Sequence, residues 1–412
     1  MVQIKRTLIF APETFNLAET TRAIEVAKKC SEHFRCVFVG YSKKYSDLIE
    51  QSQFLFLHLE PHLSEKDVEQ LMSVDQMRGI KHPFTYKHLK TRVTHEKKII
   101  RMYEPVAVVI GTTLSMFISS RASKTPLVYI KPLAYTRTFF LKERWDLPDA
   151  LQKSYLPQKI IKNLTKNVAL CITYKPRSFA KLAKEEGVVL PKYTIDCLDA
   201  DFNLITTIPE ISQVIDLPPH YKYIGPVYAK LDAPIPDFLR SLPKGKPVIY
   251  FAMGSSGSAD ILVRFLRVLE ALPFTIVCPM KRALEADGYS FKSNIYLCDY
   301  LPAHKIGELI DVSVIHGGEG TVQTACLSGK PFLGYGLQQE QQVNINQCVK
   351  YGNAISLKKK DVTKEHMHRL IDYALTDKRL RQRASDIKQL LQGIDGPANA
   401  AAFLIEQFAT KD

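Results

Sequence analysis

Short apolar runs alternate with amphipathic segments along most of the chain. The first two apolar runs, residues 6–12 and 36–40, are rich in β-branched and aromatic side chains, which is typical of buried strands. Between them, residues 17–30 repeat their small and apolar side chains at helical spacing. Strands that alternate with helices predict parallel sheets covered by helices on both faces. The expected fold class is therefore α/β.

The same alternation continues towards the C-terminus. Further strands are predicted at residues 54–57, 106–110, 127–130, 168–172, 221–224, 247–253, 274–278, 295–301, 312–315 and from 332. Further helices are predicted at residues 261–272, 322–328, within 360–391, and at 396–408. Residues 227–247 are rich in proline and show no apolar periodicity, which is typical of a linker. Two domains are therefore expected, 1–229 and 230–412.

The composition fits two globular domains of ordinary size, with 412 residues, 46% hydrophobic and 24% charged. The apolar stretch at 105–120 is too short and too polar to span a bilayer. The first residues lack the apolar core of a signal peptide. Eight scattered cysteines without a Cys-x-x-Cys motif give no sign of a zinc site or a disulfide framework. A reducing cytoplasm is therefore the expected location.

The formal net charge of +14 permits an anionic partner such as a nucleotide, an acidic membrane surface or a nucleic acid. Basic residues crowd residues 78–101, and residues 142–166 are basic and amphipathic, with one tryptophan. Solvated basic helix faces are one interpretation. Peripheral contact with the inner face of a membrane is the other. No nucleic-acid-binding module accompanies the charge, so no nucleic acid is expected as a partner.

The most informative stretch is residues 312–346. A β-branched run ends at His316, a glycine-rich turn covers 317–321, and a helix-compatible segment follows. This arrangement directs backbone N–H groups at an anion, and the helix N-terminus adds about half a positive charge. Glycine allows the backbone to approach a phosphate closely. The polar run 338–342 is expected at the carboxyl end of the next strand, where open α/β sheets bind their ligands.

These motifs resemble the nucleotide-sugar glycosyltransferases of the GT-B fold, and within the UDP-glycosyltransferase superfamily its bacterial macrolide-glycosyltransferase branch. The family carries a His-Gly-Gly-x-Gly-Thr/Ser turn, a helix, a Gly-x-Pro strand start and an acidic-Gln pair followed by Asn. In this sequence the motifs are His316 to Thr321, Gly329-Lys330-Pro331, Glu340-Gln341 and Asn344. The likeness is good over the C-terminal half and weak over the N-terminal half.

The resemblance implies two Rossmann-like, doubly wound domains that face a cleft. Domain 1–229 would bind the acceptor and domain 230–412 the nucleotide sugar, with a last helix at about 397–410 that crosses back to the first domain. The implied reaction moves a hexosyl group from a UDP- or dTDP-sugar to a small-molecule or lipid acceptor. It would invert the anomeric centre and require neither a metal nor another cofactor.

The resemblance also implies roles for individual residues. Those expected to hold the nucleotide and its diphosphate are Gly254, Ser255, Tyr300, His316, Gly317, Gly318, Gly320 and Thr321. Of these, His316 is also expected to act in catalysis, and Tyr300 stands where the family stacks a tryptophan on the base. Glu340 and Gln341 are expected to hold the sugar hydroxyls.

The catalytic base is the point at which this sequence departs from the family. The family places a histidine in the loop after the first strand, and the aligned residue here is Thr14. Glu13 is the nearest side chain that can take a proton. It is either the base, a group that orients the acceptor, or a solvated carboxylate that caps the next helix. His82, His88 and His95 are alternative bases.

Two other functions are compatible with the sequence. A nucleotide-sugar 2-epimerase can share the fold and would act on its substrate without an acceptor. A non-catalytic partner protein would explain the loss of the family's histidine, although the intact turn after His316 argues against it.

Overall fold

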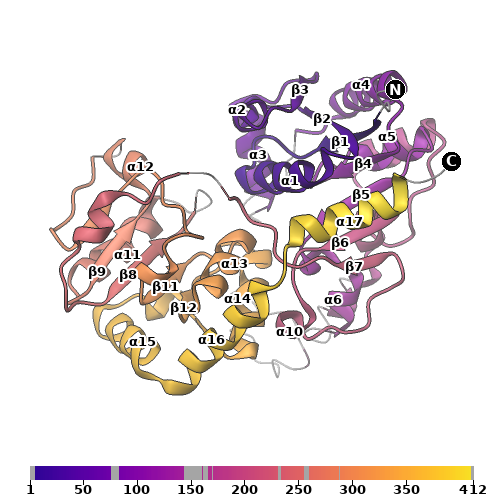
Figure 1. Cartoon of the computed structure of the whole chain (residues 1–412). Helices are drawn as coiled ribbons and strands as arrows, with labels where there is room; N and C mark the ends of the chain where they lie inside the picture. Colours follow the sequence, from indigo (N-terminus) through magenta and orange to yellow (C-terminus); the bar gives the residue numbers. More distant parts are fainter. Residues whose placement is uncertain are drawn as a thin grey trace. The chain divides into compact units, whose positions relative to one another are not determined.

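The computed structural model describes residues 5–75, 83–142, 160, 166–168, 170–230, 233–254, 259–286 and 288–409. The chain divides into two compact units (Figure 1). Unit 1 comprises residues 1–229 and 395–412, and unit 2 comprises residues 230–394. In the described part of the chain, no helix combines the length and apolarity that a bilayer crossing requires.

Within its described residues, unit 1 contains a seven-stranded parallel sheet in the order β3-β2-β1-β4-β5-β6-β7. The strands are β1 (Arg6–Ala11), β2 (Phe34–Gly40), β3 (Leu55–His58), β4 (Ala107–Ile110), β5 (Leu127–Lys131), β6 (Phe202–Ile205) and β7 (Tyr221–Tyr223). The strand order reverses between β1 and β4. The loops that follow these two strands therefore lie at the topological switch point, where such sheets bind ligands.

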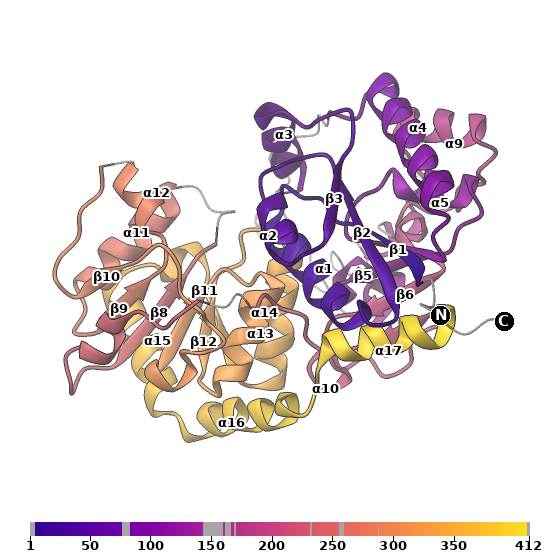
Figure 2. The ribbon, with the colours of Figure 1, turned by 45° about the horizontal axis from the view of Figure 1, so that its top comes forward.

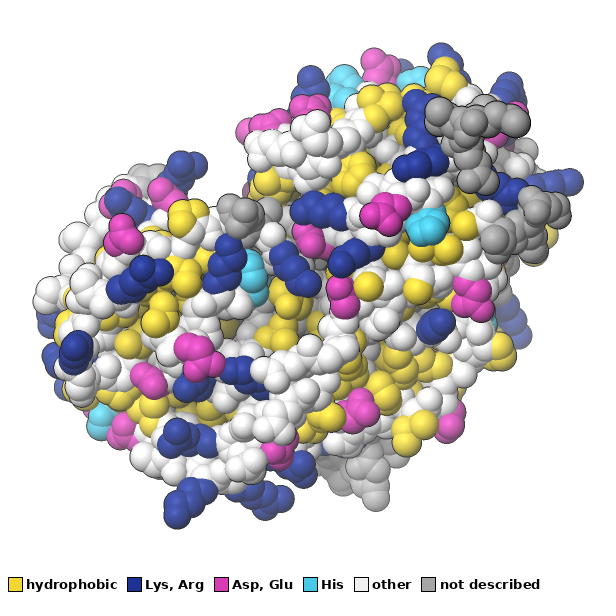
Figure 3. Space-filling view, in the orientation of Figure 1, with side chains coloured by type: hydrophobic (Ala, Val, Ile, Leu, Met, Phe, Trp, Pro, Cys, Tyr) yellow, Lys and Arg dark blue, Asp and Glu magenta, His cyan; other side chains and the backbone are white. Residues whose placement is uncertain are grey.

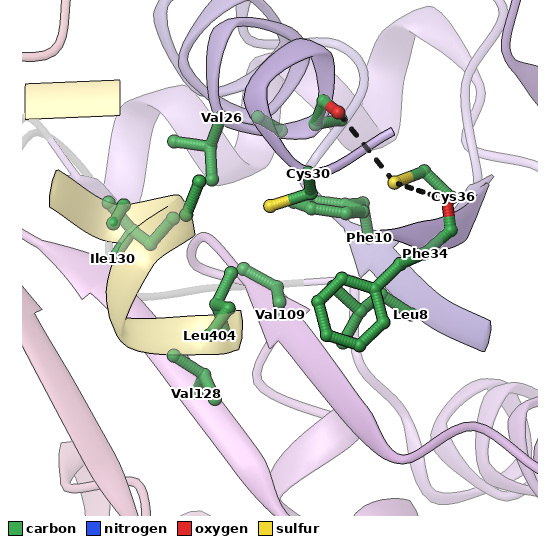
Figure 4. Close-up of a cluster of buried hydrophobic side chains, with 14 of the residues drawn as sticks. Leu8, Phe10, Val26, Cys30, Phe34, Cys36, Val109, Val128, Ile130 and Leu404 are labelled. Carbon is green, nitrogen blue, oxygen red and sulfur yellow. Dashed lines mark hydrogen bonds between the residues drawn. The ribbon is translucent and has the colours of Figure 1, made fainter. Parts of the chain in front are cut away.

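Helices cover both faces of this sheet (Figure 2). They are α1 (Leu17–Cys30), α2 (Ser46–Gln51), α3 (Glu65–Asp75), α4 (Tyr86–Tyr103), α5 (Met116–Ala122), α6 (Arg137–Lys142), α9 (Arg177–Glu185), α10 (Pro209–Ser212) and α17 (Gly396–Phe408), with 3-10 turns η1 (Leu133–Tyr135) and η2 (Ile195–Leu198). Successive β1 residues point to opposite faces. Leu8 and Phe10 pack with α1 and α17 (Figure 4), whereas Ile9 packs with α4 and α5.

The last helix, α17, belongs to unit 1 although the preceding residues belong to unit 2. Leu404 lies in the buried cluster shown in Figure 4. The Asn399 Nδ2 group donates to the Ile224 carbonyl at 2.9 Å. A Cβ on Gly396 would lie 2.1 Å from the Pro226 carbonyl oxygen. Only glycine therefore permits this close entry of the chain into α17.

Unit 2 contains, within its described residues, a six-stranded parallel sheet in the order β10-β9-β8-β11-β12-β13. The strands are β8 (Val248–Ala252), β9 (Thr275–Cys278), β10 (Ile295–Leu297), β11 (Val312–Ile315), β12 (Phe332–Gly334) and β13 (Ala354–Ser356). The helices are α11 (Ala259–Glu270), α12 (Lys281–Ala286), α13 (Glu319–Ser328), α14 (Gln339–Tyr351), α15 (Lys364–Thr376) and α16 (Lys378–Gln392), with 3-10 turns η3 (Asp237–Ser241), η4 (Gly307–Leu309) and η5 (Lys359–Asp361). The switch point lies between β8 and β11.

Two predictions about elements were wrong. Residues 168–172 do not form a strand, because the described residues 166–168 and 170–171 are helical and Val168 and Ile172 are exposed. The strand that pairs with β5 is instead β6. The polar run 338–342 does not end a strand either. β12 already ends at Gly334, and the glutamines, which are good helix formers, begin α14 at Gln339.

Candidate functional site

The carboxyl ends of β8 and β11 bring the two predicted glycine turns of unit 2 together. Ile315 and Ala252 are register partners at the ends of these neighbouring parallel strands. The Gly254 turn and the turn that begins at His316 therefore leave the sheet side by side, at its switch point. Ser255, which was predicted to flank the diphosphate, lies outside the described residues.

The His316 ring has a fixed orientation and a defined tautomer. Its Nδ1 atom lies 3.2 Å from the Ala252 carbonyl oxygen. Because a carbonyl oxygen only accepts, Nδ1 must carry the hydrogen. Burial lowers the pKa of the imidazole below its usual value, with the Ala252 carbonyl acting in the opposite direction. The ring is therefore neutral near pH 7, and Nε2 presents a lone pair.

Glycines make the space that the His316 ring occupies. A Cβ on Gly254 would lie 2.7 Å from His316 Nε2, and one on Gly318 would lie 2.4 Å from the same atom. Gly254 also adopts a positive φ of 65°, which side-chain-bearing residues rarely adopt. The ring is thus held between the two turns, and Nε2 faces both.

The helix α13 starts at the same point. Its N-cap is Gly318, which has no side chain with which to cap the first N–H groups. These groups lack acceptors within the helix and carry the positive end of its dipole. The Thr321 N–H is an exception, because it donates to the Gly318 carbonyl at 2.9 Å. Thr321, one of the predicted diphosphate donors, can therefore donate to a diphosphate through its hydroxyl group but not through its N–H.

The first turn of α14 packs directly on the His316 turn. Gly317 has a φ of 84°, and a Cβ there would lie 2.6 Å from the Gln341 carbonyl oxygen. Asn344 Nδ2 donates to the Gly317 carbonyl at 3.1 Å and to Glu340 Oε1 at 2.5 Å. Gln341 is buried, and its Oε1 accepts from the Leu337 N–H at 3.0 Å. Glu340 and Gln341 thus hold the loop and the turn in place.

Tyr300 follows β10 at the same edge of the sheet. Its side chain is 38% exposed, and partial burial raises the pKa of its hydroxyl. A half-exposed aromatic ring can stack on a nucleobase.

In unit 1, the loop after β1 differs from the sequence-based interpretation. Thr14 is fully buried, and its hydroxyl donates to the Ser42 carbonyl at 2.7 Å. A Cβ on Gly40 would lie 2.5 Å from Thr14. The N-cap of α1 is Asn16, whose Oδ1 accepts from the Ala18 and Glu19 N–H groups. The interpretation of Glu13 as a solvated helix cap was therefore wrong.

Glu13 is instead half of a buried ion pair. Both of its carboxylate oxygens contact Arg92 Nη2, at 2.9 and 3.2 Å, and the Arg92 side chain is completely buried. The Arg92 guanidinium lies 3.6 Å from the centre of the Tyr41 ring, a close cation–π contact. The Arg92 Nε and Nη1 atoms have no partner among the described residues. Each such buried, unpaired donor costs about 1–3 kcal/mol.

A second buried carboxylate, Glu96, lies close enough to Arg92 for their charges to interact. Glu96, one helical turn further along α4, accepts from the Tyr41 hydroxyl and the Ser115 hydroxyl, each at 2.5 Å, and from Ser119. Burial raises the pKa of the Glu13 carboxyl, the Arg92 charge opposes that rise, and nearby Glu19 and Glu96 add to it. A carboxylate in this environment accepts a proton more readily than one in water.

Sequence reasoning missed Arg92, Glu96 and Glu19 as site residues. Arg92 was interpreted as part of a solvated basic face, which is wrong because its side chain is buried. A signal was available, since Arg92 and Glu96 are four residues apart on the stripe of α4 that buries Leu89 and Val93. Glu19 gave no such signal. Its carboxylate joins the loops after β1 and β4 by accepting from the Glu13 and Thr112 N–H groups at 3.1 and 3.0 Å.

The alternative histidine bases differ in their surroundings. His82 lies outside the described residues. His95 Nδ1 lies 2.9 Å from the Glu60 carbonyl. His88 is one turn before Arg92, its Nε2 is buried without a partner among the described residues, and burial followed by the Arg92 charge lowers its pKa. Of the two described histidines, His88 is the one close to the Glu13 pair.

The chain is similar to several known proteins. Residues 264–406 match the family model "Erythromycin biosynthesis protein CIII-like, C-terminal domain". A PGL/p-HBAD biosynthesis glycosyltransferase of Mycobacterium tuberculosis (strain ATCC 25177 / H37Ra) is 24% identical over 92% of this chain and 87% of its own length. A PGL/p-HBAD biosynthesis rhamnosyltransferase of Mycobacterium bovis (strain BCG / Pasteur 1173P2) is 23% identical over 92% of this chain and 83% of its own.

A solved structure of the spinosyn rhamnosyltransferase SpnG, complexed with thymidine diphosphate, has the same fold. Its TM-score is 0.66 at 13% identity, and the match covers 98% of this chain and all of that one. The chain therefore has the GT-B fold, and its similarity to the two mycobacterial relatives identifies it as a glycosyltransferase. It resembles the nucleotide-sugar glycosyltransferases that include the bacterial macrolide branch, and the predicted fold and enzyme class are confirmed.

Proposed function

We propose that this enzyme transfers a sugar from a UDP- or dTDP-sugar to a small-molecule or lipid acceptor, with inversion at the anomeric carbon and without a metal. The observation that carries the proposal is the His316 ring, held between two glycine turns beside the start of α13. Such a site offers a ring nitrogen, backbone N–H groups and a helix dipole to a diphosphate.

In the proposed reaction, an acceptor oxygen attacks the anomeric carbon from the side opposite the diphosphate. The bond from that carbon to the diphosphate oxygen breaks, and the nucleoside diphosphate leaves with both electrons. The leaving oxygens gain negative charge, so the backbone N–H groups of Gly318 and Gly320, and His316 once its Nε2 is protonated, stabilise the transition state. Thr321 would contribute through its hydroxyl group, and Tyr300 would stack on the base.

Glu340 and Gln341 remain the candidates for contact with the sugar. Glu340 has a carboxylate in the first turn of α14, where one oxygen accepts from Asn344. A carboxylate has several lone pairs, so Glu340 can also accept from a sugar hydroxyl. Gln341 is buried and already bonded to the loop before it, which makes it the weaker candidate of the two.

Glu13 is the proposed proton acceptor. Its carboxylate lies at the switch point of unit 1, and its raised pKa brings it closer to the working pH than a free carboxylate. His88 is the second candidate, because its neutral ring has a buried nitrogen that finds no partner within the described part of the chain. The names of the mycobacterial relatives connect those proteins with PGL/p-HBAD biosynthesis and rhamnose transfer, which supports a deoxysugar donor here.

The test is to assay the purified protein with UDP- and dTDP-sugars and a panel of phenolic and lipid-linked alcohols. Release of nucleoside diphosphate and glycoside formation are measured for the unmodified protein, for His316→Ala and for His33→Ala, which replaces an exposed histidine of unit 1. Loss of one such donor lowers turnover by about 10²–10³. Unchanged nucleotide binding and turnover in His316→Ala would remove His316 from the site.

The alternatives are separated by the same assay. An epimerase would convert UDP-GlcNAc alone to its 2-epimer without an acceptor. A non-catalytic partner protein would release no diphosphate with any donor. The comparisons favour neither of them over transfer.

A further inference from the structure

Two buried thiols connect the two helices that form the donor site. Cys326 lies on α13 and Cys348 on α14, and their Sγ atoms are 3.8 Å apart. Their side chains are 1% and 0% exposed. The Asn353 amide donates to the Cys326 sulfur at 3.4 Å. Neither thiol takes part in the proposed transfer reaction.

The first turn of α14 is in direct contact with the turn that begins at His316. Asn344 of α14 holds the Gly317 carbonyl, and a side chain at Gly317 has no room beside the Gln341 carbonyl. A shift of α14 relative to α13 therefore has to displace the turn that positions His316. A displacement of about 1 Å can cost about 100-fold in rate even when it originates away from the reacting atoms.

We propose that Cys326 and Cys348 form a reversible disulfide with hydrogen peroxide as the oxidant, and that this bond lowers donor-site activity. The control of activity rests on the function proposed above, whereas formation of the disulfide does not. A disulfide requires the sulfurs to approach from 3.8 Å to about 2.05 Å. Closing this gap disturbs the packed interface between α13 and α14, which links the chemistry of the thiols to the geometry of the turn.

Cys326 is the attacking thiol. Hydrogen bonds from the Cys348 thiol and from the Asn353 amide lower its pKa, with burial acting in the opposite direction. Its thiolate attacks one peroxide oxygen, the O–O bond breaks, and the released hydroxide takes up the thiol's proton to give water and a sulfenic acid. Cys348 then attacks the Cys326 sulfur, the S–O bond breaks, and the oxygen leaves as a second water with the Cys348 proton.

The test uses the full chain with the exposed thiol removed by Cys171→Ser. The folded protein is treated with peroxide, its remaining thiols are blocked, and it is cleaved with trypsin and a Glu-specific protease. Trypsin does not cut before proline, so cleavage after Glu340 is needed to separate peptide 320–340 from peptide 341–350. Mass spectrometry is expected to find these two peptides joined, and dithiothreitol is expected to separate them.

Turnover and the affinity for UDP and dTDP are measured on the same samples. Oxidation is expected to lower turnover by about 100-fold and to weaken nucleotide binding, both reversed by dithiothreitol. Cys348→Ala and Cys348→Ser are expected to be resistant to peroxide, with melting curves used to verify that each is folded. Absence of the cross-linked pair, or a cross-link that leaves turnover and affinity unchanged, overturns the proposal. A protein that binds no nucleotide even when reduced contradicts the proposed function instead, and peptide mapping still decides whether the disulfide forms.

Discussion

The tautomer of His316 has a consequence for how the donor binds. Its Nδ1 hydrogen is committed to the Ala252 carbonyl, so the neutral ring offers only a lone pair at Nε2. A diphosphate oxygen is also an acceptor, and the two repel unless Nε2 gains a proton. The bound diphosphate stabilises the imidazolium, which raises the pKa of His316 in the complex above its lowered value in the free enzyme.

We therefore expect donor binding to take up a proton at His316. The extra affinity is complete below the pKa of the free enzyme and is lost as pH rises through the higher pKa of the complex. Calorimetry of UDP and dTDP binding near neutral pH, in buffers of different ionisation enthalpy, measures the uptake. His316→Gln is expected to abolish it and His33→Gln to leave it unchanged. Equal uptake in the unmodified protein and in His316→Gln would contradict this account.

The second prediction at the residue scale concerns Glu13. If Glu13 accepts the acceptor's proton, activity falls as pH drops through its pKa, which burial has raised. Glu13→Gln is expected to lower kcat/KM by about 10²–10⁴ and to remove this acidic limb of the pH profile. Glu32→Gln, at an exposed position, is the matched control. The base would instead be His88 if Glu13→Gln keeps the acidic limb of the pH profile and His88→Gln loses it.

Residues were predictable where a motif combines several constraints. His316 and its glycines were identified because strand end, turn and helix start coincide in a short stretch. The buried Arg92–Glu13 pair was missed, because charged residues are normally exposed and the helical spacing of Arg92 and Glu96 with the buried Leu89 and Val93 was overlooked. Thr14 shows a different limit: alignment with the family's histidine suggested a position in the site, yet this side chain is packed between Gly40 and Ser42.

Among the elements, the start of α13 gives the sharpest prediction, because Gly318 leaves room for the His316 ring. Gly318→Ala would place a methyl group 2.4 Å from Nε2. The ring must then leave its bond to Ala252, and donor turnover is expected to fall by about 10²–10³, as for loss of a catalytic hydrogen-bond donor. Gly393→Ala is the control, since a Cβ there meets nothing within 4 Å.

Steady-state kinetics and nucleotide titrations of both glycine variants provide the measurement. Normal donor affinity in Gly318→Ala would show that the His316 ring can move without loss of donor binding. The close approach of Gly318 to the ring would then not be needed for function. A loss in both variants would indicate a general effect on unit 2 rather than on the site.

The type of each element was predictable from periodicity only where the period was unambiguous. Buried parallel strands such as β1 and β11 read as short β-branched runs between helices and glycines. The run at 168–172 has the same composition but lies in a helical segment, because a short apolar run fits either element and tertiary contacts decide between them. The glutamine-rich start of α14 was misplaced for a related reason, since β12 is only three residues long.

At the scale of the whole molecule, the excess positive charge bears on whether the enzyme reaches a lipid acceptor at an anionic membrane surface. Lys and Arg side chains are dispersed over the face shown in Figure 3, with Asp and Glu between them. On α4, some of the charge is compensated by the residue that follows α9, since Lys97 lies 2.5 Å from Glu186. Lys87, Lys98 and Arg101 on the same helix are exposed. These three are the described part of unit 1 best suited to contact an anionic surface.

We expect the protein to bind vesicles that contain anionic lipid more tightly than neutral ones, and to lose this preference as salt is raised. Each basic side chain near such a surface contributes about 1 kcal/mol, so the triple change Lys87→Gln, Lys98→Gln and Arg101→Gln should weaken binding roughly 100-fold. The control changes three exposed lysines of unit 2 to glutamine, namely Lys359, Lys360 and Lys364. Both triple variants lower the net charge equally. Co-sedimentation that falls equally in both would mean that net charge alone drives binding, and no sedimentation of the unmodified protein would exclude membrane contact through this helix.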